Sequence, residues 1–397
     1  MDITYDTSIE KSPAAWGAVF SMALCVAVLI ASEFMPVSLL SPIAADLQIT
    51  GGKTGQAISI SGIFAVLTSL FVSGLTRRID RRLVISGFSA LLILAGLIVT
   101  FAPNYAVLML GRALLGLAIG GFWSMSTAIV MRLVPKDQVS KGLAMLNAGN
   151  AIAATISAPL GSLLGDYLGW RGAFFFVVPI AVLAFVWQLV SLPSLPPLKS
   201  EGSANVFLLL KRRQVRLGMA STALLFMGQF ALFTYLRPFL ETITGLEISM
   251  LSLVLLVMGL AGVVGTYFVS QLLKTRLYSI VIGIPLVLAV IAAALVVFGS
   301  VPLVVAGLLM AWGVFGTAAP VGWGTWLSKV LPNDAEAGGG LQVATIQLAI
   351  TLGAAGGGIL FDAVGWWSPF ALSAVLLCAS SLLAVVAWRA ALEKSTP

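Results

Sequence analysis

Residues 277–328 read LYSIVIGIPLVLAVIAAALVVFGSVPLVVAGLLMAWGVFGTAAPVGWGTWLS, a run of 52 residues without aspartate, glutamate, lysine or arginine. One helix needs about 20 apolar residues to cross a bilayer, so this run is long enough for two crossings. Eight further runs free of these four residue types lie at 12–32, 54–76, 83–111, 113–131, 172–198, 248–273, 337–361 and 363–388. The sequence therefore predicts a polytopic membrane protein.

The composition agrees with this prediction. Hydrophobic residues make up 59% of the 397 residues and charged residues 9%, whereas a soluble domain carries about 25% charged residues. The apolar runs are too long and too continuous for the short alternating strands of a β-barrel, so we expect an all-α membrane protein. The chain begins with the polar and acidic MDITYDTSIEKS, which is unlike a cleavable signal peptide.

The residue types present also limit the chemistry. The chain contains no histidine, which excludes His-ligated metal sites and catalytic groups of the Ser-His-Asp or Cys-His kind. Cys25 and Cys378 lie in apolar segments, where free thiols behave as small hydrophobic groups, so we expect no disulfide. These residue types lead us to expect no catalytic residues, no metal and no cofactor. Nothing in the sequence resembles a nucleotide-binding motif, so we expect no direct use of ATP. The net charge of +7 comes from basic loops, which indicates membrane orientation and not nucleic-acid binding.

Glycine and proline residues divide the runs into twelve predicted membrane-spanning segments. If the N-terminus is cytoplasmic, 18 lysines and arginines lie in cytoplasmic loops and three, Lys53, Arg171 and Arg237, lie on the opposite side. Since basic residues concentrate on the cytoplasmic side, we expect both termini in the cytoplasm. The segments are 16–38, 54–75, 83–102, 107–130, 141–164, 173–192, 217–238, 249–272, 277–298, 303–328, 338–360 and 367–389.

A cytoplasmic linker at 193–216 divides the chain into two parts of six segments, 1–192 and 217–397. The linker opens with PSLPP and closes with KRRQVR. RLVPKD (132–137) recurs as KVLPND (329–334), and DYLGW (166–170) recurs as DAVGW (362–366). Matches at the same places in both parts predict a duplicated six-helix bundle, an arrangement typical of transporters.

Three motifs resemble those of the major facilitator superfamily. The loop SGLTRRIDRR (73–82) is similar to the family's G-x-x-x-D-R-x-G-R-R, with Asp80 in place of a glycine. The fourth segment carries R-x-x-x-G-x-x-x-G, and APLGSLLG (158–165) carries part of the antiporter signature of the fifth. The residues at these motif positions are Arg78, Asp80, Arg81, Arg82, Arg112, Gly116, Gly120, Pro159 and Gly161.

Longer stretches resemble the drug:proton antiporter branch and, within it, the bacterial purine ribonucleoside efflux pumps. They are EFMPVSLLSPIAADL (33–47), GRALLGLAIGGFWSMS (111–126), MRLVP (131–135), SLPSLP (191–196), GQFALFTYLRP (228–238), PVGWGTWLSK (320–329) and QVATIQLA (342–349). The resemblance implies proton-coupled export of nucleosides such as inosine and guanosine across a bacterial inner membrane. The alternative is sugar (arabinose-like) or multidrug efflux by the same mechanism. The expected partners are the small-molecule substrate, protons and the lipid bilayer, with the chain acting as a monomer.

Two charged residues lie well inside the predicted segments. Glu33 is the only acid more than about a turn inside one, and Arg112 is the only base. A charge at mid-helix costs about 3 kcal/mol, and in a chain without histidine a carboxyl is the natural reversible proton carrier. We therefore expect both residues to serve proton coupling. The alternative for Glu33 is contact with water or another helix, and for Arg112 a static ion pair that holds its half together.

Amides and aromatic rings suit a flat, uncharged purine nucleoside, because amides both donate and accept hydrogen bonds. The alternative for each amide is a bond between helices. The alternative for each tryptophan is an anchor at the membrane surface, which we expect for Trp326. The candidate substrate-binding residues are Asn147, Asn150, Gln229, Tyr235, Gln342, Gln347, Trp123, Trp312 and Trp323.

The other motif residues are expected to shape the protein. Gly116 and Gly120 allow close helix approach, and Pro159 with Gly161 can bend the fifth segment. The arginines of 77–82 are expected to set topology and hold a cytoplasmic loop. Acids at the outer ends of segments are expected to be solvated, namely Asp46, Asp166, Glu241, Glu247 and Asp362.

Two classes besides a transporter are disfavoured. A membrane-embedded enzyme would need paired acids, histidine or cysteine near one membrane face, which the segments do not offer. A passive channel is disfavoured by the duplicated halves, and accumulation of substrate against a gradient would exclude it.

The topology can be tested with reporter fusions. A reporter fused after Gly202 should read cytoplasmic, and one fused after Pro302 should read periplasmic, because six and nine crossings precede these points. A periplasmic signal from the Gly202 fusion would mean that the helix count or the orientation is wrong.

Overall fold

The computed structural model describes residues 14–76, 78–135, 138–196, 206–273, 275–331 and 335–392. These residues form helices joined by short loops, which confirms the all-α fold, and eleven helical spans are long and apolar enough to cross a membrane. The helices are α1 (Trp16–Leu47), α2 (Gly51–Leu75), α3 (Arg81–Thr100), α4 (Tyr105–Leu133), α5 (Val139–Ser191), α6 (Val206–Leu209), α7 (Arg213–Phe233), α8 (Leu236–Thr242), α9 (Ile248–Leu272), α10 (Leu277–Phe298), α11 (Pro302–Val330), α12 (Ala335–Ala363) and α13 (Ser368–Leu392).

Helix α5 contains two crossings. Its 53 residues are interrupted at Gly169, which has φ 71° and ψ 166°, a conformation that favours glycine. Gly149 lies against the backbone of Ala23, and Ser191 lies 3.2 Å from Ser21 through their hydroxyl oxygens. Residues from both parts of α5 thus lie beside the same turn of α1, so the chain doubles back at Gly169. Counting α5 twice gives twelve crossings, the predicted number.

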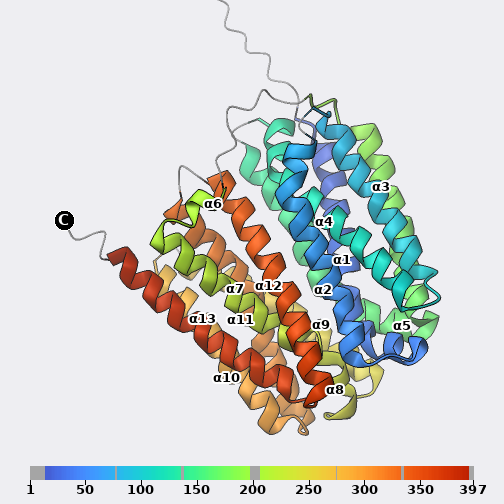
Figure 1. The fold of residues 1–397 in the computed structure, drawn as a ribbon, viewed down its shortest axis with the longest axis vertical. Helices are drawn as coiled ribbons and strands as arrows, with labels where there is room; N and C mark the ends of the chain where they lie inside the picture. The colour runs from blue at the N-terminus through green and yellow to red at the C-terminus, as the bar shows by residue number, and fades with distance from the viewer. Residues whose placement is uncertain are drawn as a thin grey trace, which may run out of the picture.

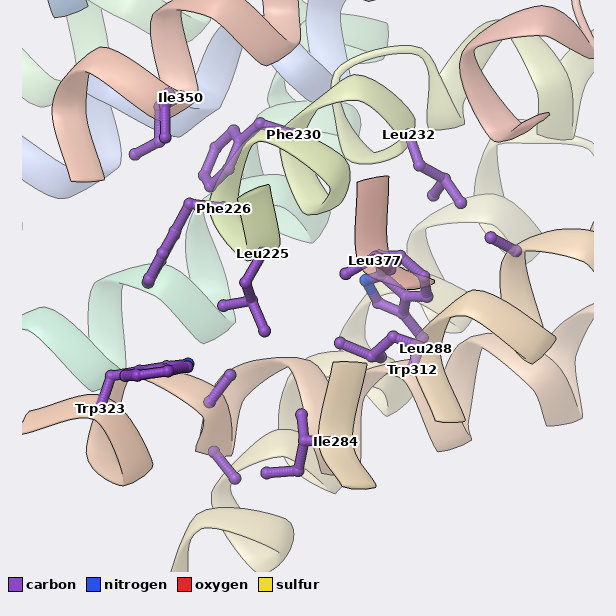
Figure 2. Packing of buried hydrophobic residues seen from close by; sticks show 14 of the residues in the cluster. Leu225, Phe226, Phe230, Leu232, Ile284, Leu288, Trp312, Trp323, Ile350 and Leu377 are labelled. Carbon is purple, nitrogen blue, oxygen red and sulfur yellow. The ribbon is translucent and has the colours of Figure 1, made fainter. Parts of the chain in front are cut away.

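The helices form two groups that lie side by side (Figure 1). Helices α1–α5 pack around one cluster of buried apolar side chains, and α7–α13 pack around most of another. In the second cluster, Phe226 of α7 lies between Phe230 of the same helix and Trp323 of α11, and Trp312 lies near Leu288 and Leu377 (Figure 2). The groups meet along α2 and α12, α5 and α9, and α1 and α8, a contact region that we call the seam. The domain boundaries at 192 and 217 stay a prediction, because 197–205 lie outside the described residues.

The helix starts repeat along the chain with nearly constant spacing. Gly51 of α2 and Ile248 of α9 are 197 residues apart, as are Tyr105 of α4 and Pro302 of α11. Arg81 of α3 and Leu277 of α10 are 196 apart. The repeated helix starts have the spacing of the repeated sequence stretches, as expected for a duplicated unit.

Most segments begin or end a few residues from their predicted bounds, and the two largest departures occur near prolines. Helix α1 was predicted to end at 38, but it continues to Leu47 through Pro36 and Pro42. The seventh segment, predicted as 217–238, begins earlier at Arg213 and breaks after Phe233, before Pro238. Proline removes one helical hydrogen bond, so the carbonyl four residues earlier in the helix is left free to accept from another donor.

The start of the linker is bound to the first group of helices. Leu195 is 5% exposed, its carbonyl accepts from the backbone N–H of Arg81, and its own N–H donates to Asp80. We call the end of the molecule that holds these residues the linker end and the opposite end, where α5 reverses, the Gly169 end.

Candidate functional site

Glu33 lies in the interior of α1 and is 3% exposed. Its carboxyl group interacts with the side-chain amide of Gln347, which comes from α12 in the other half, and with the charge of Arg112. Next to it, Phe34 approaches Phe230 and Phe233 of α7 with ring centroids 5.7 and 6.5 Å away. The one deeply placed carboxyl therefore lies at the seam, where relative movement of the halves changes its surroundings.

Arg112 binds backbone oxygens and does not form the static ion pair that was the alternative to a role in proton coupling. It is fully buried, and its Nη1 donates to the carbonyl of Ser32 at 2.6 Å. Ser32 is four residues before Pro36, so its carbonyl has no helical partner. Other guanidinium nitrogens donate to Ala57 and to the backbone of Glu33, and the ion pairs in the described residues join other residues. Arg112 thus ties α1, α2 and α4 together.

In the second half, Gln229 likewise donates to a carbonyl that a proline leaves without a helical partner. Its Nε2 donates at 3.1 Å to the carbonyl of Gly316, four residues before Pro320 in α11. A side chain from α7 thus supplies the donor that proline removed. This geometry favours the helix-to-helix alternative for Gln229, although its carbonyl oxygen remains available.

A third freed carbonyl is bonded across the seam. Pro42 leaves the carbonyl of Ser38 without a helical donor, and Nη1 of Arg237 donates to it from α8. Arg237 also pairs with Glu241 at 2.6 Å and is 3% exposed. Arg237, counted in the sequence as a loop cation, is instead a buried bridge between the halves.

The hydrogen bonds across the seam gather between the level of Glu33 and the Gly169 end. Asp362 accepts from Thr50 Oγ1 at 2.5 Å and from the backbone N–H of Gly52 at 3.0 Å, so it binds the start of α2. Ser59 donates to the carbonyl of Thr351 at 3.1 Å. In this structure the halves are therefore joined by hydrogen bonds towards the Gly169 end.

Tyr235 also lies at this contact between the halves. It is fully buried, and its hydroxyl donates to the carbonyl of Ala354 at 2.9 Å. Its ring stacks on Phe361 at 5.1 Å. A methyl group on Gly55 of α2 would collide with the Tyr235 hydroxyl, so the glycine permits this packing. The structure places Tyr235 between helices and not on an open surface.

Three of the acids at the outer ends of segments have protein partners; Asp46 and Asp362 are nevertheless exposed, as expected, and only Glu241 is half-buried. Asp362 binds α2 and Glu241 pairs with Arg237, as described above. Asp46 pairs with Arg171 at 2.6 Å and accepts from the Trp170 indole at 3.2 Å. Each of these acids lies near the polar ends of helices, where donors are concentrated. Asp166 and Glu247 are exposed, as expected.

Three candidate amides remain accessible on membrane helices. Asn147 is exposed and donates only within α5, to the carbonyl of Leu143 at 2.9 Å. Asn150 and Gln342 are half-buried. The sequence offers no way to place these side chains relative to Glu33, but helix contacts do: Gly149 lies beside Ala23, ten residues from Glu33 along α1. Asn150, the residue after Gly149, thus lies about 15 Å from the level of Glu33, measured along the axis of α1 towards the linker end.

The candidate tryptophans differ in how far they are buried. Trp123 is half-buried, while Trp312 and Trp323 are 5% and 1% exposed. Trp326 was expected as a surface anchor, but it is 1% exposed and packs against Gly218 and Trp323. Glycine at 218 leaves room for the indole of Trp326. The position of Trp326 near Lys329 in the sequence gave no sign of this contact.

The motif glycines lie at close helix contacts. A methyl group on Gly116 would collide with the backbone of Ser61, and one on Gly120 with Ala65, so α4 packs closely on α2. Gly161 of α5 faces Ser38 and Met35 of α1. Two residues before it, Pro159 frees the carbonyl of Thr155, which lies against Gly259 of α9 across the seam.

The basic loop at the linker end is organised by Asp80. Its carboxylate caps α3 at the backbone N–H of Arg82 and accepts from Ser194 and Leu195. Burial would raise the pKa of Asp80, but these hydrogen bonds and the charge of Arg132 outweigh it, so the pKa lies below its ordinary value. Arg81 donates to Thr76 and Arg82 to the Leu189 carbonyl. Arg78 is exposed, and Arg77 lies outside the described residues.

Sequence reasoning missed the aromatic group Phe34, Phe230 and Phe233, the bridge made by Arg237 and the seam glycines Gly52, Gly55 and Gly62. A signal was available for the bridge, since Pro42 shows that the Ser38 carbonyl needs a donor. The identity of the donor depends on how α8 meets α1, which no local pattern contains.

Comparisons with known proteins agree with this architecture. A family model described as Major Facilitator Superfamily matches residues 22–337. The chain is 45% identical over 368 residues, 93% of each chain, to "Purine ribonucleoside efflux pump NepI" of Escherichia coli (strain K12). It is 50% identical over 390 residues, 97% of each, to "Transcription regulatory protein OpdE" of Pseudomonas aeruginosa. A crystal structure of a bacterial homolog to the human lysosomal transporter Spinster superposes with a TM-score of 0.71 at 13% identity, covering 97% of both chains.

The role of Gln229 can be tested with a double-mutant cycle. Gln229→Leu should lower the unfolding temperature, because an interhelical hydrogen bond contributes about 0.5–2 kcal/mol. In a Pro320→Ala background, residue 320 regains an N–H for Gly316, so the same substitution should cost much less. Thermal unfolding in detergent measures both effects. Gln214→Leu is the control, since Gln214 bonds Tyr278 at 3.2 Å, and its cost should not depend on residue 320. Equal costs for Gln229→Leu in both backgrounds would contradict the assignment.

Proposed function

The chain belongs to the major facilitator superfamily, and on that premise we propose that it exports purine ribonucleosides in exchange for protons. Transport by a multi-pass membrane protein follows from the family. The nucleoside substrate is supported by 45% identity to a protein named as a purine ribonucleoside efflux pump. The name of OpdE concerns transcription, but the described residues are membrane helices, so we base the proposal on the pump.

The buried carboxyl of Glu33 at the seam is the observation that supports proton coupling. Protonation removes a charge from a site that is 3% exposed, and an isolated buried charge is costly. The carboxyl meets Gln347 of the opposite half, so opening the seam exposes it to a different environment. Proton binding and the arrangement of the halves are then linked, as alternating access requires.

The path for the nucleoside runs from the aromatic group beside Glu33 towards the linker end. Phe34, Phe230 and Phe233 offer ring faces for a purine base. The half-exposed amides Asn150 and Gln342 lie on helices whose surroundings would otherwise be apolar, and polar side chains within membrane segments face a bundle interior or a water-filled space. Amides there can bond both base edges and ribose hydroxyls. Gln347 completes this group beside Glu33.

The proposal assigns the Gly169 end to the periplasm and the linker end to the cytoplasm. The 18-to-3 distribution of basic residues supports this orientation. The structure, fastened at the Gly169 end, would then be ready to load substrate from the cytoplasm. A single chain contains both halves and the whole seam, so we propose a monomer as the working unit.

The substrate is tested in inverted membrane vesicles with an imposed pH gradient. Inosine and guanosine should accumulate, because the vesicle interior corresponds to the periplasm, while arabinose and a cationic dye should not. Vesicles without the protein give the background. Accumulation of arabinose or of the dye in place of the nucleosides would identify a sugar or multidrug exporter and overturn the nucleoside assignment.

Coupling is tested with Glu33→Gln, which keeps size and hydrogen bonding but cannot release a proton. This variant should fail to accumulate nucleoside against its gradient, yet it should still exchange substrate between equal pools. Glu247→Gln is the matched control, because Glu247 is exposed at the start of α9, and it should pump normally. Uphill transport by Glu33→Gln at a normal rate would show that Glu33 is not the carrier.

A further inference from the structure

A hollow of about 350 Å³ lies at the linker end of the second half. The first turn of α10 forms one side, Lys329 at the end of α11 another, and Trp388 of α13 a third. Among the residues that the structure describes, its lining includes two cations, Arg276 and Lys329, and no acidic residue. A site of this composition attracts an anion.

The equivalent place in the first half shows what belongs there. Asp80 is the N-cap of α3, and Arg276, 196 residues later, is the N-cap of α10. Arg132 at the end of α4 corresponds to Lys329, 197 residues later, within the repeated RLVPKD and KVLPND stretches. In the first half the Asp80 carboxylate accepts from the α3 N-terminus, Ser194 and Leu195, close to the charge of Arg132.

In the described part of the second half, no carboxylate takes the place of Asp80 at the start of α10. Position 276 carries a cation in place of the carboxylate, and no side chain caps α10. The first N–H groups of a helix lack helical partners and carry partial positive charge. Arg276, Lys329 and the α10 N-terminus therefore concentrate positive charge around a hollow whose counterpart holds a carboxylate.

The surroundings of the hollow identify the source of the anion. Ser279 lies on its rim and begins a face of α10 that continues through exposed apolar side chains: Leu286, Val290 and Val297 are 50%, 63% and 72% exposed. Exposed apolar residues at this spacing on a membrane helix contact lipid chains. Trp388, 40% exposed, stacks on Tyr278 at 6.2 Å, and such rings favour the headgroup region.

We propose that this hollow binds the headgroup of an anionic phospholipid, with the phosphate between Arg276, Lys329 and the N-terminus of α10 and the acyl chains along the exposed face of α10. The lipid takes the place that Asp80 fills in the first half. It thereby caps α10 and holds the ends of α10 and α11 together. The proposal does not depend on the identity of the transported substrate.

The test measures lipid binding to the delipidated full-length protein by native mass spectrometry and thermal unfolding. Phosphatidylglycerol should bind and raise the unfolding temperature, whereas phosphatidylcholine with the same chains should bind much more weakly. Since one basic residue near anionic lipid changes affinity about fivefold, Arg276→Gln with Lys329→Gln should weaken phosphatidylglycerol binding about 30-fold. Lys211→Gln, at an exposed cation of the linker that does not line the hollow, should leave binding unchanged.

Arg276→Asp provides a variant that should remain stable. It restores the arrangement of the first half with an internal carboxylate, so the unfolding temperature should be kept while the response to phosphatidylglycerol is lost. Equal binding of both lipids by the native protein, or unchanged binding in the double variant, would overturn the proposal. Inorganic phosphate alone raising the unfolding temperature as much as phosphatidylglycerol would also overturn it, since a free anion and not a lipid would then fill the hollow.

Discussion

The structure depends on one requirement: every backbone carbonyl inside the bilayer needs a hydrogen-bond donor, because no water is present to replace it. Prolines within the helices break this rule at known places, four residues before each ring. Arg112, Arg237 and Gln229 supply donors for the carbonyls freed by Pro36, Pro42 and Pro320. Each donor comes from a different helix, so the defect in one helix becomes a bond that fixes its neighbour. At these three prolines the freed carbonyl thus joins one helix to another.

These three bonds differ in what happens when the halves move. Arg112 and Gln229 each act within one half and need not change. Arg237 acts across the seam, so opening the Gly169 end must break its bond to Ser38 and leave that carbonyl to water. The same movement separates Asp362 from Thr50 and Gly52. The groups bonded across the seam at the Gly169 end are therefore polar and can be solvated when they separate, whereas the glycines there, such as Gly55, permit close approach without adding apolar surface.

The sequence predicts the number of crossings, the repeat and the family, because apolar runs, spacing and motifs are local or directly comparable signals. It also singles out Glu33, because a deep carboxyl is rare. It fails where a side chain's role depends on a distant helix. Trp326 looks like a surface anchor until Gly218 is placed beside it, and Gln229 looks like a substrate ligand until Gly316 is placed within 3.1 Å. The predicted end of α1 at 38 is too early, because the donors for the Ser32 and Ser38 carbonyls come from α4 and α8 and cannot be read from the sequence of α1.

The duplicated halves share a frame but not their chemistry at equivalent positions. EFMPVSLLSP (33–42) corresponds to QFALFTYLRP (229–238), 196 residues later. Glu33 thereby matches Gln229: a carboxyl can release a proton, but an amide of nearly the same shape cannot. Pro42 matches Pro238, yet α1 continues through the first and the chain breaks before the second. If both halves carried the carboxyl, two buried charges would face one seam. Under the proposed mechanism, placing the ionisable group in one half confines proton binding to Glu33, while Gln229 in the other half keeps the hydrogen bond to Gly316.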